Sequence, residues 1–269
     1  MKAVLYPRHD YAAPRLEAFA AGLVRHGIAP AFATRGMAVD CDLAVIWSHK
    51  ETAVIDRQRA AGRDYLVLEQ GFVGDRARWT SAGFNGLNGR ADFVNKGSPP
   101  DRWHGLFADL MRPWRVQGSG QYILFLLQVP GDAAISMVDY APWVARTIRA
   151  LETLHGLPVF VRHHPVGRFP QISHPEIKGD LVAALENAEF AVTFSSTAAV
   201  DAVLAGVPTI TMDPGAMAWP VTGHDLAVQP PRAPREQWAH DLAYAQWADF
   251  EMRRGACWDH LKHGLMAGV

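Results

Sequence analysis

The sequence predicts an α/β protein built from two Rossmann-type, parallel-sheet domains. Short apolar segments alternate with segments of helical periodicity from residue 2 to residue 69, and again from residue 121 to residue 213. Between these stretches the alternation is lost in the glycine-containing residues 71–100. Open parallel sheets bind ligands at the carboxyl ends of their strands, so two such halves are expected to face each other across a cleft.

In the first half, the helix predicted over residues 13–27 has Leu16, Phe19 and Leu23 at helical spacing and ends at a glycine. A second helix is predicted over 50–62. Strands are predicted over residues 2–6, 29–34, 41–47 and 64–69. The predicted connection to the second half consists of an irregular loop at 71–100, a helix at 102–111 and a linker at 112–120.

In the second half, residues 121–129 form an almost uninterrupted apolar run, which is typical of a strand buried on both faces. The other predicted elements are strands at 157–165, 189–196 and 207–213 and helices at 140–156, 180–188 and 197–206. We therefore predict one domain at residues 1–116 and another at 117–236. Residues 237–269 are predicted to be a helical tail that packs back on the first domain.

Composition excludes several classes of protein. Of the 269 residues, 49% are hydrophobic and 20% are charged, and the net charge is −1, so nucleic acid could be bound only through a local basic patch. The two cysteines, Cys41 and Cys257, are far apart, which argues against a disulfide framework or a zinc site and fits a reduced, cytoplasmic setting. The sequence has no apolar stretch long enough to span a bilayer.

Polar residues follow the predicted strands of the second half, where ligands of parallel sheets bind. They are Gln128 and Asp132, then Arg162, His163 and His164, then Ser195, Ser196 and Thr197, and finally Asp213. A helix start with hydroxyl groups, beside arginine and histidine, is a site for a phosphate. The alternatives are that the serines and the threonine only cap the helix and that the histidines only lie on a turn.

Three segments, "YILFLLQVPGDAAI", "VFVRHHP" and "TFSSTAAVDAVLAGVPTI", resemble the C-terminal half of the capsule-polysaccharide glycosyltransferases that transfer Kdo, which have the GT-B fold. The shared pattern is a Q-x-x-x-D segment, a His-Pro pair and a serine-rich helix start. In this sequence it is formed by Gln128 and Asp132, His164 and Pro165, and Ser195 and Ser196. The first half adds a Glu-x-Gly-Phe segment, matched by Glu69, Gly71 and Phe72.

The resemblance implies an enzyme that moves a sugar from a nucleotide-sugar co-substrate, CMP- or UDP-linked, to an acceptor hydroxyl without a metal or other cofactor. The residues expected to bind this donor are Gln128, Asp132, Arg162, His164, Pro165, Ser195, Ser196 and Thr197, with His164 also taking part in catalysis. Glu69 and Asp75 are the candidates for the general base, and Asp132 is a third. Alternatively, Glu69 and Asp75 form ion pairs with Arg76 or Arg78, and Asp132 holds a helix start. Whether the reaction retains or inverts configuration is not predicted.

The chain departs from this family in being short and in carrying "GDRARWTSAGFNGLNGRADF", which is similar to uncharacterised phage and prophage proteins. The acceptor is therefore a carbohydrate or, alternatively, hydroxymethylated pyrimidine bases in phage DNA. A non-catalytic nucleotide-binding scaffold is a further alternative. The expected acceptor-side residues are Arg76, Arg78, Trp79, Asn85, Asn88 and Arg90. Clusters of arginine and tryptophan, here and near residues 102 and 114, either bind phosphates and bases or pack in the protein.

Overall fold

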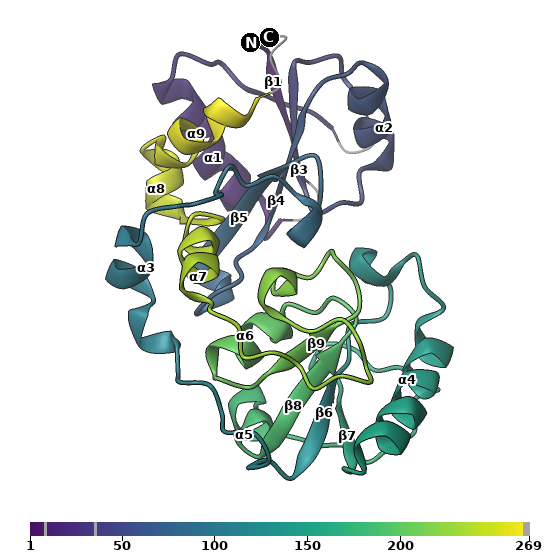
Figure 1. Ribbon diagram of the computed structural model, residues 1–269. Coiled ribbons are helices and arrows are strands. Elements are labelled where there is room, and N and C mark those ends of the chain that lie inside the picture. Colours follow the sequence, from purple (N-terminus) through teal and green to yellow (C-terminus); the bar gives the residue numbers. More distant parts are fainter. Residues whose placement is uncertain (8–9, 35–36, 266–269) are drawn as a thin grey trace. The chain divides into compact units, whose positions relative to one another are not determined.

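The computed structural model describes residues 1–7, 10–34 and 37–265, and its contacts divide the chain into two compact units (Figure 1). Unit 1 comprises Met1–Gly105 and Ala239–Val269, and unit 2 comprises Leu106–Trp238. The chain passes between the units within α3 (Asp101–Leu106) and again within α7 (Glu236–Ala243).

The first boundary lies earlier than the predicted residue 116 because the segment after α3 is hydrogen-bonded into unit 2. The Arg112 amide donates to the Leu204 carbonyl (2.8 Å), and the Arg115 amide donates to the Gly206 carbonyl (2.7 Å). The buried guanidinium of Arg235 donates to the carbonyls of Val203 and Arg112. The predicted linker is therefore part of the packed structure of unit 2.

The sheet of unit 1 has six strands within the described ranges, and it is mixed. In spatial order they are β10 (Gln246–Ala248), β5 (Trp79–Phe84), β4 (Tyr65–Gln70), β3 (Leu43–Trp47), β1 (Ala3–Tyr6) and β2 (Ala31–Phe32). The four strands β1 to β4 pair in parallel, as predicted. Strand β5 is antiparallel to both β4 and β10.

Strands β5 and β10 are not where the sequence indicates strands. Residues 71–100 are predicted to be loop, yet they contain β5, and its Gly83 has a packing role. A methyl group there would lie 2.7 Å from the Phe93 ring and 2.8 Å from the Ala91 side chain. The predicted helical tail contains β10 between α7 and the short helices α8 (Asp249–Arg253) and α9 (Ala256–Leu261).

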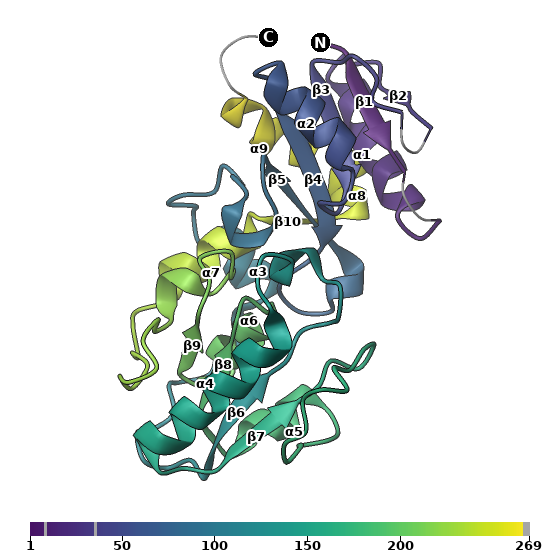
Figure 2. The ribbon, with the colours of Figure 1, turned by 90° about the vertical axis from the view of Figure 1, so that its right-hand side faces the viewer.

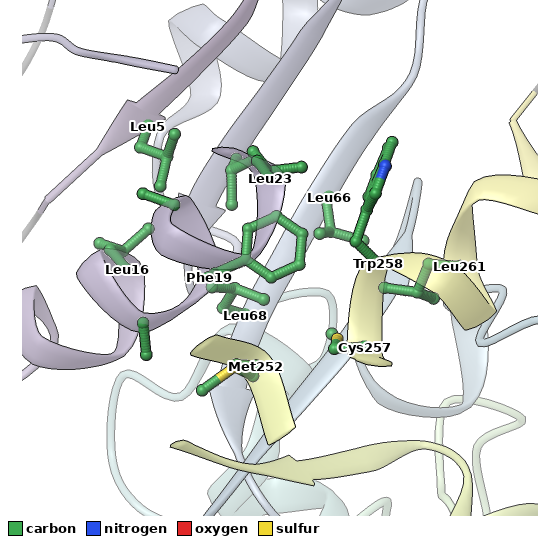
Figure 3. Packing of buried hydrophobic residues seen from close by; sticks show 14 of the residues in the cluster. Leu5, Leu16, Phe19, Leu23, Leu66, Leu68, Met252, Cys257, Trp258 and Leu261 are labelled. Atoms are coloured by element: carbon green, nitrogen blue, oxygen red, sulfur yellow. The ribbon is translucent and has the colours of Figure 1, made fainter. Parts of the chain in front are cut away.

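Helices cover both faces of this sheet because its strand residues alternate between two apolar clusters. On one face, α1 (Ala13–Arg25), α8 and α9 pack on Leu5, Leu66 and Leu68, with Trp258 and Phe19 in edge-to-face contact (Figure 3). On the other face, α2 (Thr52–Ala60) packs against the alternate residues of the same strands. The C-terminal stretch is thus part of the core of unit 1.

Unit 2 contains a parallel sheet with helices on both faces (Figures 1 and 2). Its described strands, in spatial order, are β7 (Val159–Arg162), β6 (Tyr122–Leu126), β8 (Ala188–Thr193) and β9 (Thr209–Thr211). Helix α4 (Tyr140–His155) packs on one face, and α5 (Leu181–Glu186) and α6 (Ala198–Leu204) pack on the other. These elements match the predicted strands and helices of the second half.

Among the described residues, no helix has the length and apolar character needed to cross a membrane.

Two glycines of unit 2 allow a test of whether the segment before β6, which contains Pro113, packs against the residues that follow α6. Gly206 (φ +80°) and Gly156 (φ +63°) both have left-handed backbone, but only at Gly206 would an added methyl group overlap a neighbour, the Pro113 carbonyl. Gly156→Ala should lower the free energy of unfolding by about 1–2 kcal/mol, the cost of left-handed backbone alone. Gly206→Ala should cost more, and denaturant unfolding of both variants measures the difference. Equal losses would mean that the Pro113 carbonyl does not pack against Gly206 in solution.

Candidate functional site

The carboxyl ends of β6 and β8 are joined by a pair of buried polar side chains, Gln128 and Ser195. The Ser195 amide donates to Gln128 Oε1 (2.9 Å), and Gln128 Nε2 donates to Ser195 Oγ (3.3 Å). Both residues are almost fully buried, with 3% and 1% of their surface exposed. The side chain of Gln128 thus provides an acceptor for a backbone donor in the turn after β8.

The start of α6 is capped by one of the three predicted hydroxyl residues. Ser196 Oγ accepts a hydrogen bond from the Ala198 amide (3.2 Å), whereas Thr197 stands at the N-cap position without a capping bond from its side chain. Ser195 Oγ is directed to the Gln128 side chain and, at 3.4 Å, to the Ala134 carbonyl. The three residues therefore have different local roles, and the helix start keeps the positive end of its dipole at this edge of the sheet.

Asp132 holds a helix start, which is one of the two roles predicted for it. It precedes a short 3-10 helix, η4 (Ala133–Ile135), and its Oδ1 accepts from the Ala134 amide (2.9 Å). The carbonyl of that same Ala134 is the one that Ser195 contacts. The Q-x-x-x-D segment and the serine segment thus lie directly against each other.

His164 and Pro165 follow β7, which is the neighbour of β6 in the sheet. Leu126 of β6 pairs with Arg162 of β7, so Gln128 and His164 each lie two residues beyond the same rung of the sheet. Neighbouring strands are about 4.8 Å apart, which places the ends of β7, β6 and β8 within about 10 Å. His164 Nδ1 accepts from the Val166 amide (3.2 Å), so a neutral His164 carries its proton on Nε2, where it can donate to an anion.

The other members of the basic cluster, Arg162 and His163, are only partly engaged by the protein, because Arg162 Nε and His163 Nδ1 are buried without a hydrogen-bond partner among the described residues. Arg162 Nη2 donates to the Gly179 carbonyl (2.9 Å), just before α5. Burial lowers the pKa of His163, and the neighbouring Arg168 lowers it further, while Glu176 acts in the opposite direction. His163 is therefore neutral at neutral pH. Of the two histidines, His164 is the one whose tautomer is set by a hydrogen bond from its own turn.

Glu69 and Asp75 lie at and beyond the carboxyl end of β4 in unit 1. Glu69 is half-buried, and its Oε1 accepts from the Gln70 amide (3.0 Å). Asp75 is exposed and caps the 3-10 helix η1 (Arg76–Arg78) by accepting from the Ala77 amide (3.2 Å). The structure thus brings both candidate bases to the same edge of the unit 1 sheet.

The turn after Glu69 is fixed by Gln246 of β10, a residue that no sequence pattern indicates. Gln246 is fully buried; its Oε1 accepts from the amides of Phe72 (2.6 Å) and Val73 (3.0 Å), and its Nε2 donates to the Val73 carbonyl (3.2 Å). Gly71 is required in this turn, because a methyl group there would lie 2.5 Å from Trp79 Cβ and 2.9 Å from Gln246 Oε1. No local pattern could have identified Gln246, since it is 173 residues away from Val73.

The expected acceptor-side residues do not come together, because β5 runs antiparallel to β4. Arg76, Arg78 and Trp79 lie at the carboxyl end of β4, whereas Asn85, Asn88 and Arg90 follow β5 to the opposite end of the sheet, about 17 Å away for five residues of strand. Asn85 is also held locally. Its side chain accepts from the Tyr65 amide (3.1 Å) and donates to Asp64 (2.5 Å).

Two of the arginine–tryptophan clusters are used in packing. Arg102 lies over the Trp247 ring (4.3 Å), forms an ion pair with Glu251 and donates to the Gln246 carbonyl (3.0 Å). Arg235 lies over the Trp114 ring (3.9 Å), and Trp114 itself donates to the Ala233 carbonyl. For these clusters the packing interpretation accounts for the contacts that the structure shows.

Within the described ranges, no group of three or more His, Cys, Asp and Glu side chains gathers in a metal-binding arrangement. Cys41 and Cys257 are both buried, free thiols. Burial raises the pKa of both thiols, most strongly for Cys257, which keeps them protonated and unreactive.

Comparison with solved structures identifies the fold. The chain is similar to the beta Kdo 2,4 transferase KpsC of Thermosulfurimonas dismutans, with a TM-score of 0.60 and 17% identity over 91% of this chain and 90% of that one. It is also similar to the beta Kdo 2,7 transferase KpsC of the same organism, with a TM-score of 0.58 and 13% identity over 98% and 100% of the two chains. No protein-family model and no curated protein matches the sequence. The predicted α/β, two-domain GT-B fold is confirmed.

The hydrogen bonds between Gln246 and the turn after Glu69 can be tested by measuring the stability of that turn. Gln246→Ala would leave the Phe72 and Val73 amides buried without their acceptor, which costs about 1–3 kcal/mol. Amide hydrogen exchange at both residues should accelerate. Gln58→Ala is the matched control, because Gln58 is also a buried glutamine of unit 1 but donates to the Asp64 carbonyl (2.7 Å). Similar acceleration at Phe72 and Val73 in both variants would show that the effect is general destabilisation.

Proposed function

We propose that this chain is a glycosyltransferase that moves a sugar from a nucleotide sugar to an acceptor hydroxyl. The observation that carries the proposal is the joined carboxyl edge of unit 2, where the Gln128–Ser195 pair lies beside His164 and the start of α6. The fold shared with two Kdo transferases supports it.

In this proposal, the phosphate of the donor is held at the carboxyl edge of unit 2. His164 donates a hydrogen bond through Nε2, and the positive end of the α6 dipole at the same edge attracts the negative charge of the phosphate. Negative charge develops on the nucleotide phosphate as its bond to the sugar breaks. Donors fixed before the reaction stabilise that charge more in the transition state than in the ground state.

The general base is one of the two carboxylates of unit 1. It accepts the proton of the acceptor hydroxyl while the hydroxyl oxygen attacks the anomeric carbon and the nucleotide departs with the bonding electrons. We assign this role to Glu69, because Gln246 and Gly71 fix the turn that follows it. Asp75 is the alternative, although its Oδ1 already caps η1.

The acceptor proposed here is a carbohydrate hydroxyl. The arginine–tryptophan clusters around Arg102 and Arg235 pack within the protein, so they provide no support for an acceptor in DNA. The exposed side chains of Arg78 and Asp75, close to Glu69 along the chain, provide polar groups for an acceptor at the same edge of the sheet.

Donor binding can be tested by thermal unfolding with CMP, UDP and GDP. One nucleotide should stabilise the chain by about 2.7 kcal/mol at a hundredfold excess over its dissociation constant. His164→Ala should remove most of this gain. His174→Ala is the control, because His174 is a half-buried histidine of unit 2 that pairs with Glu152 (3.5 Å) away from this edge. Stabilisation by no nucleotide, or equal stabilisation of both variants, would contradict the proposed donor site.

The assignment of the base can be tested with the donor found in this way and a panel of glycoside acceptors. Glu69→Gln should lower kcat by a factor of about 10² or more, because a general base contributes about 10²–10⁴ to the rate. The same variant should still bind the nucleotide. Asp75→Asn, which retains a capping side chain, should transfer sugar within tenfold of the parent. The opposite ranking would assign the base to Asp75, and full activity of both variants would refute a base in this segment.

A further inference from the structure

Unit 2 contains a pocket that the proposed donor-phosphate site does not use. Its volume is about 500 Å³, within the range of small-molecule sites. It is bounded by the loop between β6 and α4, by the first turn of α4, and by the segment around Phe169 and Gln171. All of these residues belong to unit 2.

One wall of this pocket is aromatic and rigid. The rings of Tyr140 and Phe169 are 4.9 Å apart, and Tyr140 stacks on Trp143. The Tyr140 hydroxyl accepts from the Gln128 amide (3.0 Å), which fixes the ring. Burial raises the pKa of Tyr140, with Asp132 adding to the effect, so its hydroxyl stays neutral. Tyr140 is buried, with 4% of its surface exposed, so the ring that a ligand can reach is that of the partly exposed Phe169, which packs against Tyr140. An aromatic ring held in this way suits the apolar face of a ligand ring.

Four polar side chains of the pocket can accept hydrogen bonds; two of them can also donate, and the other two are carboxylates. They are the carboxylates of Asp132 and Asp139, the Ser136 hydroxyl and the Gln171 amide. Asp139 stands at the N-cap position of α4 but makes no capping bond with its side chain. The pocket lining has no lysine, arginine or histidine. The dipole of α4 contributes about half a positive charge, which does not balance two carboxylates.

This combination matches one class of ligand. Hydroxyl and amino groups donate hydrogen bonds to carboxylates, and the C–H face of a sugar ring packs on an aromatic wall. A carboxylate on the ligand would instead be placed near Asp132 and Asp139 with no cation in the lining to offset the repulsion.

The pocket also adjoins the proposed donor site. Asp132 of its lining caps η4, and the Ala134 carbonyl of η4 accepts from Ser195 Oγ (3.4 Å). We propose that this pocket binds the ring of an uncharged or amino-bearing sugar and discriminates against sugars that carry a carboxylate. This inference rests on the proposed function for the origin of the sugar, which is either the donor or the acceptor.

The test uses two probes that differ at one group. Methyl β-glucoside and methyl β-glucuronide have the same ring, with a hydroxymethyl group or a carboxylate at C6. Ligand-observed saturation-transfer NMR on the whole chain should give a dissociation constant at least fivefold lower for the glucoside. Phe169→Ala should weaken glucoside binding at least fivefold. Equal or tighter binding of the glucuronide by the parent chain would overturn the proposal.

The role of the two carboxylates can be tested with variants that remove their charge. The double substitution Asp132→Asn and Asp139→Asn removes both charges and keeps a side chain that can cap η4. It should reduce the preference for the glucoside to less than twofold. Asp225→Asn is the control, because Asp225 is an exposed aspartate of unit 2 that accepts from the Ala227 amide (2.9 Å) outside the pocket. A preference that survives the double substitution unchanged would overturn the role of the two carboxylates.

A competition experiment separates the two sources of the sugar. If the hexose conjugate of the stabilising nucleotide displaces the glucoside and the nucleotide alone does not, the ring belongs to the donor. If both bind without displacing the glucoside, it belongs to the acceptor; either result supports a sugar site. Glycoside binding without any transferase activity would count against the proposed function alone. Efficient transfer of a carboxylate-bearing sugar to a carboxylate-bearing acceptor would count against this pocket's selectivity alone.

Discussion

The buried side chain of Gln246 is the contact on which the arrangement of unit 1 depends. It satisfies two backbone donors and one acceptor in the turn after β4, and it comes from a strand near the other end of the sequence. An amide can do this without bringing a charge into the core, where an unpaired charge would be costly. The turn after β4 and strands β5 and β10 meet around this side chain. The buried backbone groups of the turn therefore have their hydrogen-bond partner only when β10 is paired with β5. Glu69 owes its position to a residue that lies in a different part of the sequence.

A buried glutamine also holds a turn at the carboxyl edge of the unit 2 sheet. Gln128, also buried, accepts from the backbone of the turn after β8 and so connects the end of β6 to the turn that leads into α6. In both units an uncharged side chain with one donor group and one acceptor group shapes a loop at the carboxyl ends of parallel strands. The charged and titratable residues, Glu69 and His164, are then presented by backbone that is already fixed. Such preorganisation reduces what substrate binding must supply.

The parts of the fold that the sequence predicts well are those set by local patterns. The apolar run of β6 and the helical spacing of α1 and α4 depend on neighbouring residues alone, and each element lies where it was predicted. Strands β5 and β10 depend on pairing between distant segments. Local patterns therefore do not predict them: β5 lies in a glycine-containing stretch, and β10 lies in a segment with helical periodicity. The same cause separated Asn85 from Trp79, because reversing one strand moves its far end to the opposite edge of the sheet. The motif residues of unit 2 lie at one edge of its sheet because parallel strands bring their carboxyl ends there.

The division of the chain also has a consequence for how the protein is made. Unit 1 is built from two segments, Met1–Gly105 and Ala239–Val269, whereas unit 2 is continuous. On a ribosome, all of unit 2 has been synthesised before β10, α8 and α9 emerge. Until then the face of the first sheet that receives Trp258 and Leu261 is exposed apolar surface (Figure 3). The nascent chain therefore carries a fully synthesised second unit and an incomplete first one. The exposed apolar surface of the incomplete unit is of the kind that chaperones bind.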